Sequence, residues 1–235
     1  MNVVITGASQ GIGYATAIEL AQTGSNTILG IARNGQRLEK LKSEVQKINP
    51  ATTVVPVVYD LTKLCRGSED IGSIVRKHMA KVDILINNAG LLYAKPLTEL
   101  SHEQISNMVE VNYLAPLLLI KQLIPFMDSG SHVVNISSMG GFQGSVKFPG
   151  LSVYASSKAA LASATENLAE EYKSTGIAFN CLALGATDTE MLRNAFPGYK
   201  APLTAPEMAG FIAYFATHGH KFFNGKIIPV SVSTP

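Results

Sequence analysis

The sequence predicts an α/β fold built on a doubly wound, mostly parallel sheet of about seven strands. Short β-branched runs alternate with longer helical patterns along the 235 residues. The strand-like runs are almost continuously apolar, which is typical of parallel strands covered by helices on both faces. With 46% hydrophobic and 15% charged residues, the chain can bury a substantial core. We therefore expect one domain over residues 1–235.

The alternation can be followed in order along the chain. The first four predicted strands are VVIT, NTILGIA, TVVPVV and VDILINN, and the helices that follow them cover 11–23, 34–48, 62–80 and 101–125. The order then continues with HVVNIS, a helix over about 152–174, IAFNCLAL, a helix near 206–217, and KIIPV.

Two long segments that follow strands, about 138–153 and 185–206, carry glycines and prolines and interrupt this order. Open α/β sheets bind ligands outside the carboxyl ends of their strands. We expect these two segments to form a substrate pocket and its lid.

Charge and composition exclude several classes of function. The 19 basic and 17 acidic residues give a formal charge of +2, and no basic run occurs, so nucleic acid is not expected as a partner. The N-terminus leads directly into a strand pattern without a signal sequence, and the longest apolar runs are too short to cross a bilayer. We expect no membrane partner.

Cysteine and histidine usage points to a reducing compartment and to no metal. Cys65 and Cys181 are far apart and belong to no CxxC pattern, so they read as buried bystander thiols of a cytoplasmic protein. The close pair His218 and His220 has no neighbouring carboxylate or thiol, and we interpret it as a solvated turn.

A glycine cluster, TGASQGIG at residues 6–13, lies between the first predicted strand and the first helix. Glycines gather where a chain needs positive φ or close approach to another group. The cluster is either an ordinary turn or a backbone cradle for a phosphate at a helix N-terminus. Its position after a strand and before a helix favours the cradle and suggests dinucleotide binding.

Tyr154 and Lys158 stand four residues apart at the start of an alanine-rich helix. This spacing places both side chains on one helical face, so the ammonium can lie beside the phenol. A free phenol has a pKa of about 10, and a neighbouring positive charge lowers it, which would make Tyr154 a general acid or base. The alternative is an exposed helical pair without chemistry.

Two strand ends add polar groups at the same edge. Ser138 ends the predicted strand HVVNIS, where its hydroxyl could hydrogen-bond a carbonyl or alcohol oxygen, or simply form a turn. The segment Asn87-Asn88-Ala89-Gly90 closes the fourth strand and either faces a cofactor or is an ordinary turn.

Together these features resemble the classical short-chain dehydrogenases/reductases. TGASQGIG, the NNAG segment, Asn112 in the following helix, Ser138, YASSK at 154–158 and a late glycine–threonine segment occur in the order of that family, over nearly the whole chain. The resemblance implies a Rossmann-type fold and hydride transfer between a nicotinamide and a carbonyl/alcohol pair.

The resemblance also implies catalytic roles. Tyr154 would protonate the carbonyl oxygen during reduction, and Ser138 would hydrogen-bond that oxygen. Lys158 would bind the nicotinamide ribose and lower the pKa of the tyrosine. Asn112 would steady a water leading from Lys158 to solvent.

The cofactor is expected to be NADP(H) rather than NAD(H). The segment after the second strand has no carboxylate to repel a 2′-phosphate and offers Arg33 to pair with it, although Arg33 could instead be a solvated cation at a helix start. The implied cofactor-binding residues are Gly7, Ser9, Gln10, Gly11, Ile12, Gly13, Arg33, Asn34, Asp60, Leu61, Asn88, Ala89, Gly90, Tyr154, Lys158, Gly185, Thr187 and Thr189.

The chain departs from the family pattern in three places. Leu184 stands where the family usually has proline, the segment between Ser138 and Tyr154 is a few residues longer, and only five residues follow KIIPV. We expect the longer segment to protrude around residues 142–149, and the short end to alter one subunit interface. A homodimer or homotetramer through the helices 101–125 and 152–174 is expected from the resemblance.

The leading interpretation is a carbonyl reductase or alcohol dehydrogenase for a small or medium, partly apolar substrate. A regulatory protein that senses NADP(H) without catalysis is the alternative, and a nucleotide-sugar epimerase would need a larger substrate domain. The apolar side chains expected in the pocket loops are Leu91, Leu92, Phe142, Phe148, Met191, Leu192 and Phe196.

Overall fold

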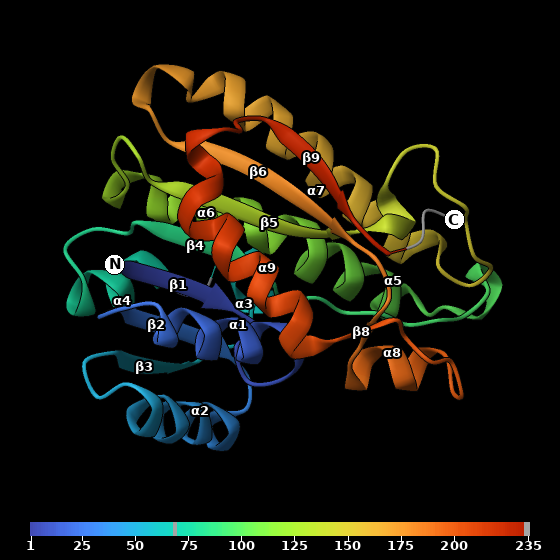
Figure 1. Ribbon diagram of the computed structural model, residues 1–235. Coiled ribbons are helices and arrows are strands. Elements are labelled where there is room, and N and C mark those ends of the chain that lie inside the picture. Colours follow the sequence, from blue (N-terminus) through green and yellow to red (C-terminus); the bar gives the residue numbers. More distant parts are fainter. Residues whose placement is uncertain (68–69, 233–235) are drawn as a thin grey trace.

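The computed structural model, which describes residues 1–67 and 70–232, contains a seven-stranded parallel sheet (Figure 1). The strand order is β3-β2-β1-β4-β5-β6-β9, which confirms the doubly wound architecture. The strands are β1 (Asn2–Thr6), β2 (Thr27–Ala32), β3 (Thr53–Val58), β4 (Ile84–Asn87), β5 (His132–Ser138), β6 (Ala178–Leu184) and β9 (Lys226–Val230).

Helices cover both faces of the sheet. One face packs against α1 (Gly11–Gln22), α2 (Gly35–Ile48) and α9 (Ala205–His218), and the other against α3 (Thr62–Cys65), α4 (Ile71–His78), α6 (Ala115–Leu123) and α7 (Ser152–Glu171). Successive strand residues point to opposite faces, so Val3 and Ile5 join the first core while Val4 joins the second. Strands buried on both sides explain the continuous apolar runs in the sequence.

Two of the predicted helices are divided. The pattern over 62–80 becomes α3 and α4, with residues 68–69 outside the described part of the chain. The pattern over 101–125 becomes α5 (His102–Val109), a π-helical turn (Glu110–Leu114) and α6. Pro116 has no N–H to donate to the carbonyl of Asn112, four residues earlier, which accounts for the wider turn there.

The predicted loop over 185–206 contains additional structure. It includes α8 (Glu190–Ala195) and a two-stranded parallel sheet of β7 (Thr187–Asp188) and β8 (Leu203–Thr204). The other predicted loop, after β5, begins with a 3-10 turn (Met139–Gly141). Further 3-10 turns occur at Leu97–Glu99, Ile124–Phe126, Lys173–Thr175 and Gly219–Lys221.

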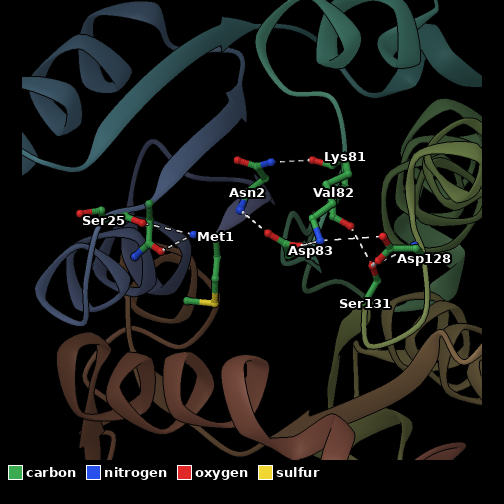
Figure 2. A network of polar contacts seen from close by, with 9 residues as sticks. Met1, Asn2, Ser25, Lys81, Val82, Asp83, Asp128 and Ser131 are labelled. Atoms are coloured by element: carbon green, nitrogen blue, oxygen red, sulfur yellow. Dashed lines mark hydrogen bonds and ion pairs between the residues drawn. The ribbon is translucent and has the colours of Figure 1, made fainter.

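A polar network ties the chain together at the amino ends of the strands, opposite the ligand edge (Figure 2). The N-terminal ammonium donates to Ser25 O, and the Asn2 amide donates to Asp83 Oδ2 at 2.8 Å. Burial alone would raise the pKa of Asp83. Hydrogen bonds from Lys81 and from the backbone N–H of Asn2, together with the positive charges of Lys81 and the N-terminal ammonium, hold this pKa below its usual value. The network fixes the start of β1 to the segment that enters β4.

The histidine pair at the end of α9 is not a fully solvated turn, contrary to the sequence interpretation. His218 is exposed, but His220 is half-buried, and its ring lies 5.7 Å from that of buried His132. Within residues 1–67 and 70–232, no group of three or more His, Cys, Asp or Glu side chains is arranged to hold a metal ion.

One helical stretch, His102–Phe126, is long and apolar enough to span a membrane by length and composition alone. Core helices of globular proteins pass the same test. Here the stretch supplies Met108, Leu119 and Leu123 to the interior, and α6 packs against the sheet. Packing explains the apolar character of the buried part, which is 33% of the most apolar window.

Candidate active site

The candidate site lies where the strand order reverses, between β1 and β4. In open α/β sheets, this switch point opens a crevice at the carboxyl ends of the strands. A cavity of about 1040 Å³ occupies that place. The loops that follow β1, β2, β3, β4, β5 and β6 all contribute to its walls.

The glycine loop forms one wall and has the geometry that a close backbone approach requires. Gly7 and Gly11 have φ of +70° and +58°, values that other residues rarely adopt. A Cβ on Gly7 would also lie 2.9 Å from the Cα of Ala89. Gly13 has a different role and does not line the cavity, because a Cβ there would meet Asn88 Nδ2 at 2.3 Å and Gly7 O at 2.5 Å. It allows α1 to pack closely on the β4 turn.

Thr6 and Asn88 fasten the glycine loop to the turn after β4. Thr6 Oγ1 accepts from the backbone N–H groups of Asn88 and Ala89 at 3.0 and 2.9 Å, and Asn88 Nδ2 donates to Thr6 O at 2.9 Å. Asn87, one residue earlier, is buried and donates to Asn135 Oδ1 at 2.8 Å. The two asparagines of the NNAG segment therefore hold backbone and sheet together, and Asn88, Ala89 and Gly90 also line the cavity.

The end of the cavity next to β2 and β3 carries the charged side chains. Arg33 and Asn34 follow β2, and the Asn34 side chain caps α2 by accepting from Arg37 N at 3.0 Å. Asp60 lies after β3, and its Oδ1 accepts from the N–H and hydroxyl of Thr62. The residue directly after β2 is thus the cation Arg33 and not a carboxylate.

Tyr154 and Ser138 meet at the opposite end of the cavity. Tyr154 is on the first turn of α7, and Ser138 is the last residue of β5, where its Oγ also accepts from Gly140 N at 3.2 Å. Burial raises the pKa of Tyr154, and a hydrogen bond with the Ser138 side chain opposes this shift. The sequence-based expectation was a lowered value, but burial dominates here.

Lys158 lies one turn further along α7 and is 3% exposed. Its Nζ donates to Ile136 O at 2.8 Å, and its own carbonyl accepts from Ser137 Oγ at 2.8 Å. The ammonium is therefore fixed to β5 from both ends of the residue. Burial lowers the pKa of Lys158 to about 8.

Asn112 lies in the π-helical turn and is fully buried. Its Oδ1 accepts from Leu91 N at 2.7 Å, and its Nδ2 donates to Leu91 O at 2.9 Å and to Ser157 Oγ at 3.0 Å. A Cβ on Gly90 would be 3.6 Å from both Asn112 Oδ1 and Lys158 Nζ, so these two side chains flank Gly90. Asn112 supports the wall from behind and does not itself line the cavity.

The segment after β6 closes the cavity above the glycine loop. Leu184, in place of the family's proline, completes β6 and pairs with Val230 of β9. Gly185 passes so close to Ser231 that a Cβ would meet its Oγ at 2.4 Å. Thr189 caps α8 by accepting from Leu192 N, and a Cβ on Gly11 would lie 3.6 Å from Thr189 Cγ2.

The structure brings almost all of the predicted site residues to one cavity. Of the predicted cofactor-binding and catalytic residues, those that do not line it are Gly13 and Asn112; of the predicted apolar pocket residues, the exception is Phe142. Residues that the sequence analysis missed include Tyr59, Arg37, Glu190 and Tyr199. For Arg37, the available signal was its place in the first turn of the helix after β2.

The family is settled by comparison with known sequences. A sequence model described as short chain dehydrogenase matches residues 1–200. The chain belongs to the short-chain dehydrogenase family. Members of this family are oxidoreductases.

Individual relatives agree with this assignment. An uncharacterized oxidoreductase of Staphylococcus epidermidis is 31% identical over 216 residues, which cover 91% of this chain and 90% of the relative. A putative NAD(P)-dependent gluconate 5-dehydrogenase from Beutenbergia cavernae with bound NADP has a TM-score of 0.85 at 27% identity, covering 98% and 94% of the two chains. L-sorbose reductase from Gluconobacter frateurii, complexed with NADPH and L-sorbose, has a TM-score of 0.85 at 25% identity, covering 99% and 95%.

Proposed function

We propose that this short-chain dehydrogenase is an NADP(H)-dependent carbonyl reductase or alcohol dehydrogenase for neutral, partly apolar small molecules. The observation that carries the proposal is the meeting of Tyr154, Ser138 and Lys158 at one end of a cavity whose other end holds the glycine loop and Arg33. A protein that only binds a nucleotide needs the second end but not the first.

The walls of the cavity fit a dinucleotide with a 2′-phosphate. Positive φ at Gly7 and Gly11 keeps side chains out of this wall, and the Gly7 N–H itself donates to Ile31 O at 2.8 Å. The first turn of α1, whose N-cap Gln10 makes no side-chain capping bond, would offer its N–H groups to a phosphate. Arg33 supplies a planar cation suited to phosphate, and the position after β2 lacks the carboxylate that commonly accepts from the 2′-hydroxyl in NAD enzymes. The NADP and NADPH complexes of the Beutenbergia and Gluconobacter proteins support this preference.

Bound NADP(H) would supply the hydride; the protein's part is to place the substrate oxygen and move a proton. Tyr154 Oη donates the proton to the carbonyl oxygen during reduction and takes it back during oxidation. The Ser138 hydroxyl hydrogen-bonds the same oxygen and stabilises its developing negative charge. Lys158, held by Ile136 O, provides a fixed positive charge next to this exchange.

Asn112 positions these groups rather than reacting. The hydrogen bonds of its side chain to Leu91 fix the turn after β4. Its main-chain carbonyl receives no hydrogen bond from Pro116, four residues later, because proline has no N–H. That carbonyl would hold a water for proton exchange between Lys158 and solvent.

The substrate end of the cavity is apolar. The charged residues that line the cavity are Arg33, Arg37 and Asp60 at the β2–β3 end, Lys158 on α7, and Glu190, which pairs with Arg37. Around Tyr154, the walls come from Leu91, Leu92, Met139, Phe148, Leu151, Met191, Leu192, Phe196 and Tyr199. Among the described residues that line this end, Lys158 is the only charged one, and its ammonium already donates to Ile136 O, so a neutral ketone or aldehyde fits best.

We also propose the remaining features of the family for this chain. It would act as one domain, with residues 138–153 and 185–206 forming the substrate loops, and would assemble as a homodimer or homotetramer through the helices 101–125 and 152–174. A cytoplasmic location agrees with its two unpaired thiols, Cys65 and Cys181.

The test is NADPH and NADH oxidation against a panel of aldehydes, ketones, diketones and 3-oxoacyl thioesters. In Tyr154→Phe, turnover should fall by about a thousandfold or more, while NADPH binding is retained, because only the transferable proton is lost. Tyr214→Phe, the same change on an exposed side chain of α9, is the control.

The outcomes distinguish an enzyme from a nucleotide-sensing protein, and a preference for NADPH from equal use of both cofactors. Unchanged turnover in Tyr154→Phe would remove this residue as the acid. Tight NADPH binding without turnover of any class in the panel would favour a nucleotide-sensing protein. Equal use of NADH and NADPH would contradict the proposed cofactor.

A further inference from the structure

An ion pair crosses the mouth of the cavity at its β2–β3 end. Arg37 Nη1 lies 3.3 Å from Glu190 Oε2. Arg37 is in the first turn of α2, and Glu190 opens α8 in the segment after β6, so the pair joins two walls that are 153 residues apart in sequence. Both side chains line the cavity, and they are 44% and 50% exposed.

The position of Arg37 is unusual for a residue with only a structural role. A positive charge in the first turn of a helix is disfavoured by the helix dipole, and α2 has no acidic residue in that turn to offset it. Arg33 stands four residues earlier, at the same end of the cavity. Two guanidinium groups thus line the same end of the cavity, next to the N-terminus of α2, and both favour an anion there.

Glu190 is the acidic side chain that partly neutralises the positive charge at this end of the cavity. Asp60, the other carboxylate lining this end, already accepts two hydrogen bonds from Thr62. The contact with Glu190 uses one Nη atom of Arg37, and a guanidinium carries five N–H donors, so Arg37 can still bind a second oxyanion. A phosphate beside Arg37 would then lie close to the Glu190 carboxylate and be repelled by it.

We propose that Arg37 is a second cation for the 2′-phosphate of NADP(H), and that Glu190 weakens its contribution. This inference rests on the proposed NADP(H) function and adds the residues that set its selectivity. NADH has no 2′-phosphate, so neither Arg37 nor Glu190 should affect how tightly NADH binds. Glu190 therefore lowers the preference for NADPH, and couples that preference to α8, which lies against the substrate end through Met191 and Leu192.

The test compares dissociation constants of NADPH and NADH, measured by the fluorescence of the bound reduced nicotinamide. Arg37→Gln should weaken NADPH binding about tenfold and leave NADH nearly unchanged, because it removes one charge-assisted contact. Glu190→Gln should tighten NADPH binding about threefold, again without effect on NADH, because it removes a partly exposed repulsion. The matched control is Arg193→Gln, which removes the Arg193–Asp188 pair of the same segment but lies outside the cavity; it should change neither constant.

Three results would overturn the proposal. If Glu190→Gln weakens the binding of NADPH and NADH equally, the ion pair acts by holding the two walls of the cavity together and not through the phosphate. If Glu190→Gln changes neither constant, or changes them as Arg193→Gln does, Glu190 exerts no electrostatic effect on the phosphate. If Arg37→Gln keeps the NADPH:NADH ratio while Arg33→Gln lowers it, Arg33 alone binds the phosphate and the proposed function stands. A wild-type protein without preference, unaffected by Arg33→Gln, would instead overturn the NADP(H) preference itself.

Discussion

At the scale of single residues, burial shifts the two reactive side chains in opposite directions. It raises the pKa of Tyr154 and lowers the pKa of Lys158 to about 8, because a low-dielectric site disfavours phenolate and ammonium alike. At neutral pH, the phenol therefore carries its proton, and most of the lysine is still charged. This is the protonation state required for reduction of a carbonyl.

The pH dependence of the two reaction directions should differ accordingly. Between pH 6 and 7, we expect kcat/KM for carbonyl reduction to be nearly constant, since Tyr154 remains protonated and Lys158 charged, and to fall above this range as Lys158 loses its proton around pH 8. Alcohol oxidation needs the phenolate, so its kcat/KM should rise with pH across the same range and beyond. Steady-state assays in both directions from pH 6 to 10 measure this. An oxidation rate that falls as the pH rises would contradict the role of Tyr154 as the base.

At the scale of elements, α1 depends on a glycine that serves packing rather than ligand binding. Gly13 lies in the helix, where its missing side chain lets α1 approach Asn88 and the carbonyl of Gly7. Gly210 lies in the middle of α9, and a Cβ there would have no atom within 4 Å among the described residues. The two positions form a matched pair of helical glycines with opposite surroundings.

Substitution by alanine should separate them. Gly13→Ala should lower the free energy of unfolding by about 2 kcal/mol or more, because backbone and amide atoms must move apart. Gly210→Ala should raise it by up to about 1 kcal/mol through helix propensity. Urea denaturation of the two variants and the wild type measures both effects. If the variants have the same stability, close packing at Gly13 is not what constrains this helix.

The elements that sequence reasoning predicted well share one physical property. The five inner strands, β2, β1, β4, β5 and β6, are buried on both faces, so their apolar runs are continuous and easy to recognise. The division of the 101–125 helix depends on one missing hydrogen bond at Pro116, which periodicity does not register. The six-residue α8 is too short for a periodic signal, and its sequence indications were the Thr189 cap and the acidic Glu190 in its first turn.

At the scale of the whole molecule, the site was predictable where it depends on strand ends. Gly7, Arg33, Asp60 and Ser138 each follow or end a strand, and a parallel sheet brings such positions to one edge. The contact between Arg37 and Glu190 was not predictable, because it depends on where the segment after β6 places α8.

Folding of the whole chain also buries a titratable side chain far from the chemistry. His132, at the start of β5, is fully buried; its Nδ1 lies 3.0 Å from Ala216 O of α9, and its Nε2 lies 3.0 Å from Asn180 Nδ2 of β6. Since an amide Nδ2 donates, Nε2 accepts and the proton is on Nδ1. The imidazole is neutral, and a second ring proton would face the N–H of Asn180. Burial, with a smaller contribution from nearby His220, lowers the pKa of His132 from 6.5 to about 4.

This shift should make the stability of the protein depend on pH in a defined window. Below pH 6.5, the unfolded chain binds a proton that folded His132 does not take up until about pH 4, so the free energy of unfolding should decrease as the pH falls through this range. The loss from this one group is roughly 3 kcal/mol by pH 4. Urea unfolding at pH 7.5, 5.5 and 4.5 should show the decrease in the wild type and in His132→Gln a correspondingly weaker one. His102→Gln, which removes an exposed histidine, should keep the wild-type slope. If His132→Gln keeps that slope as well, the acid sensitivity of the fold originates elsewhere.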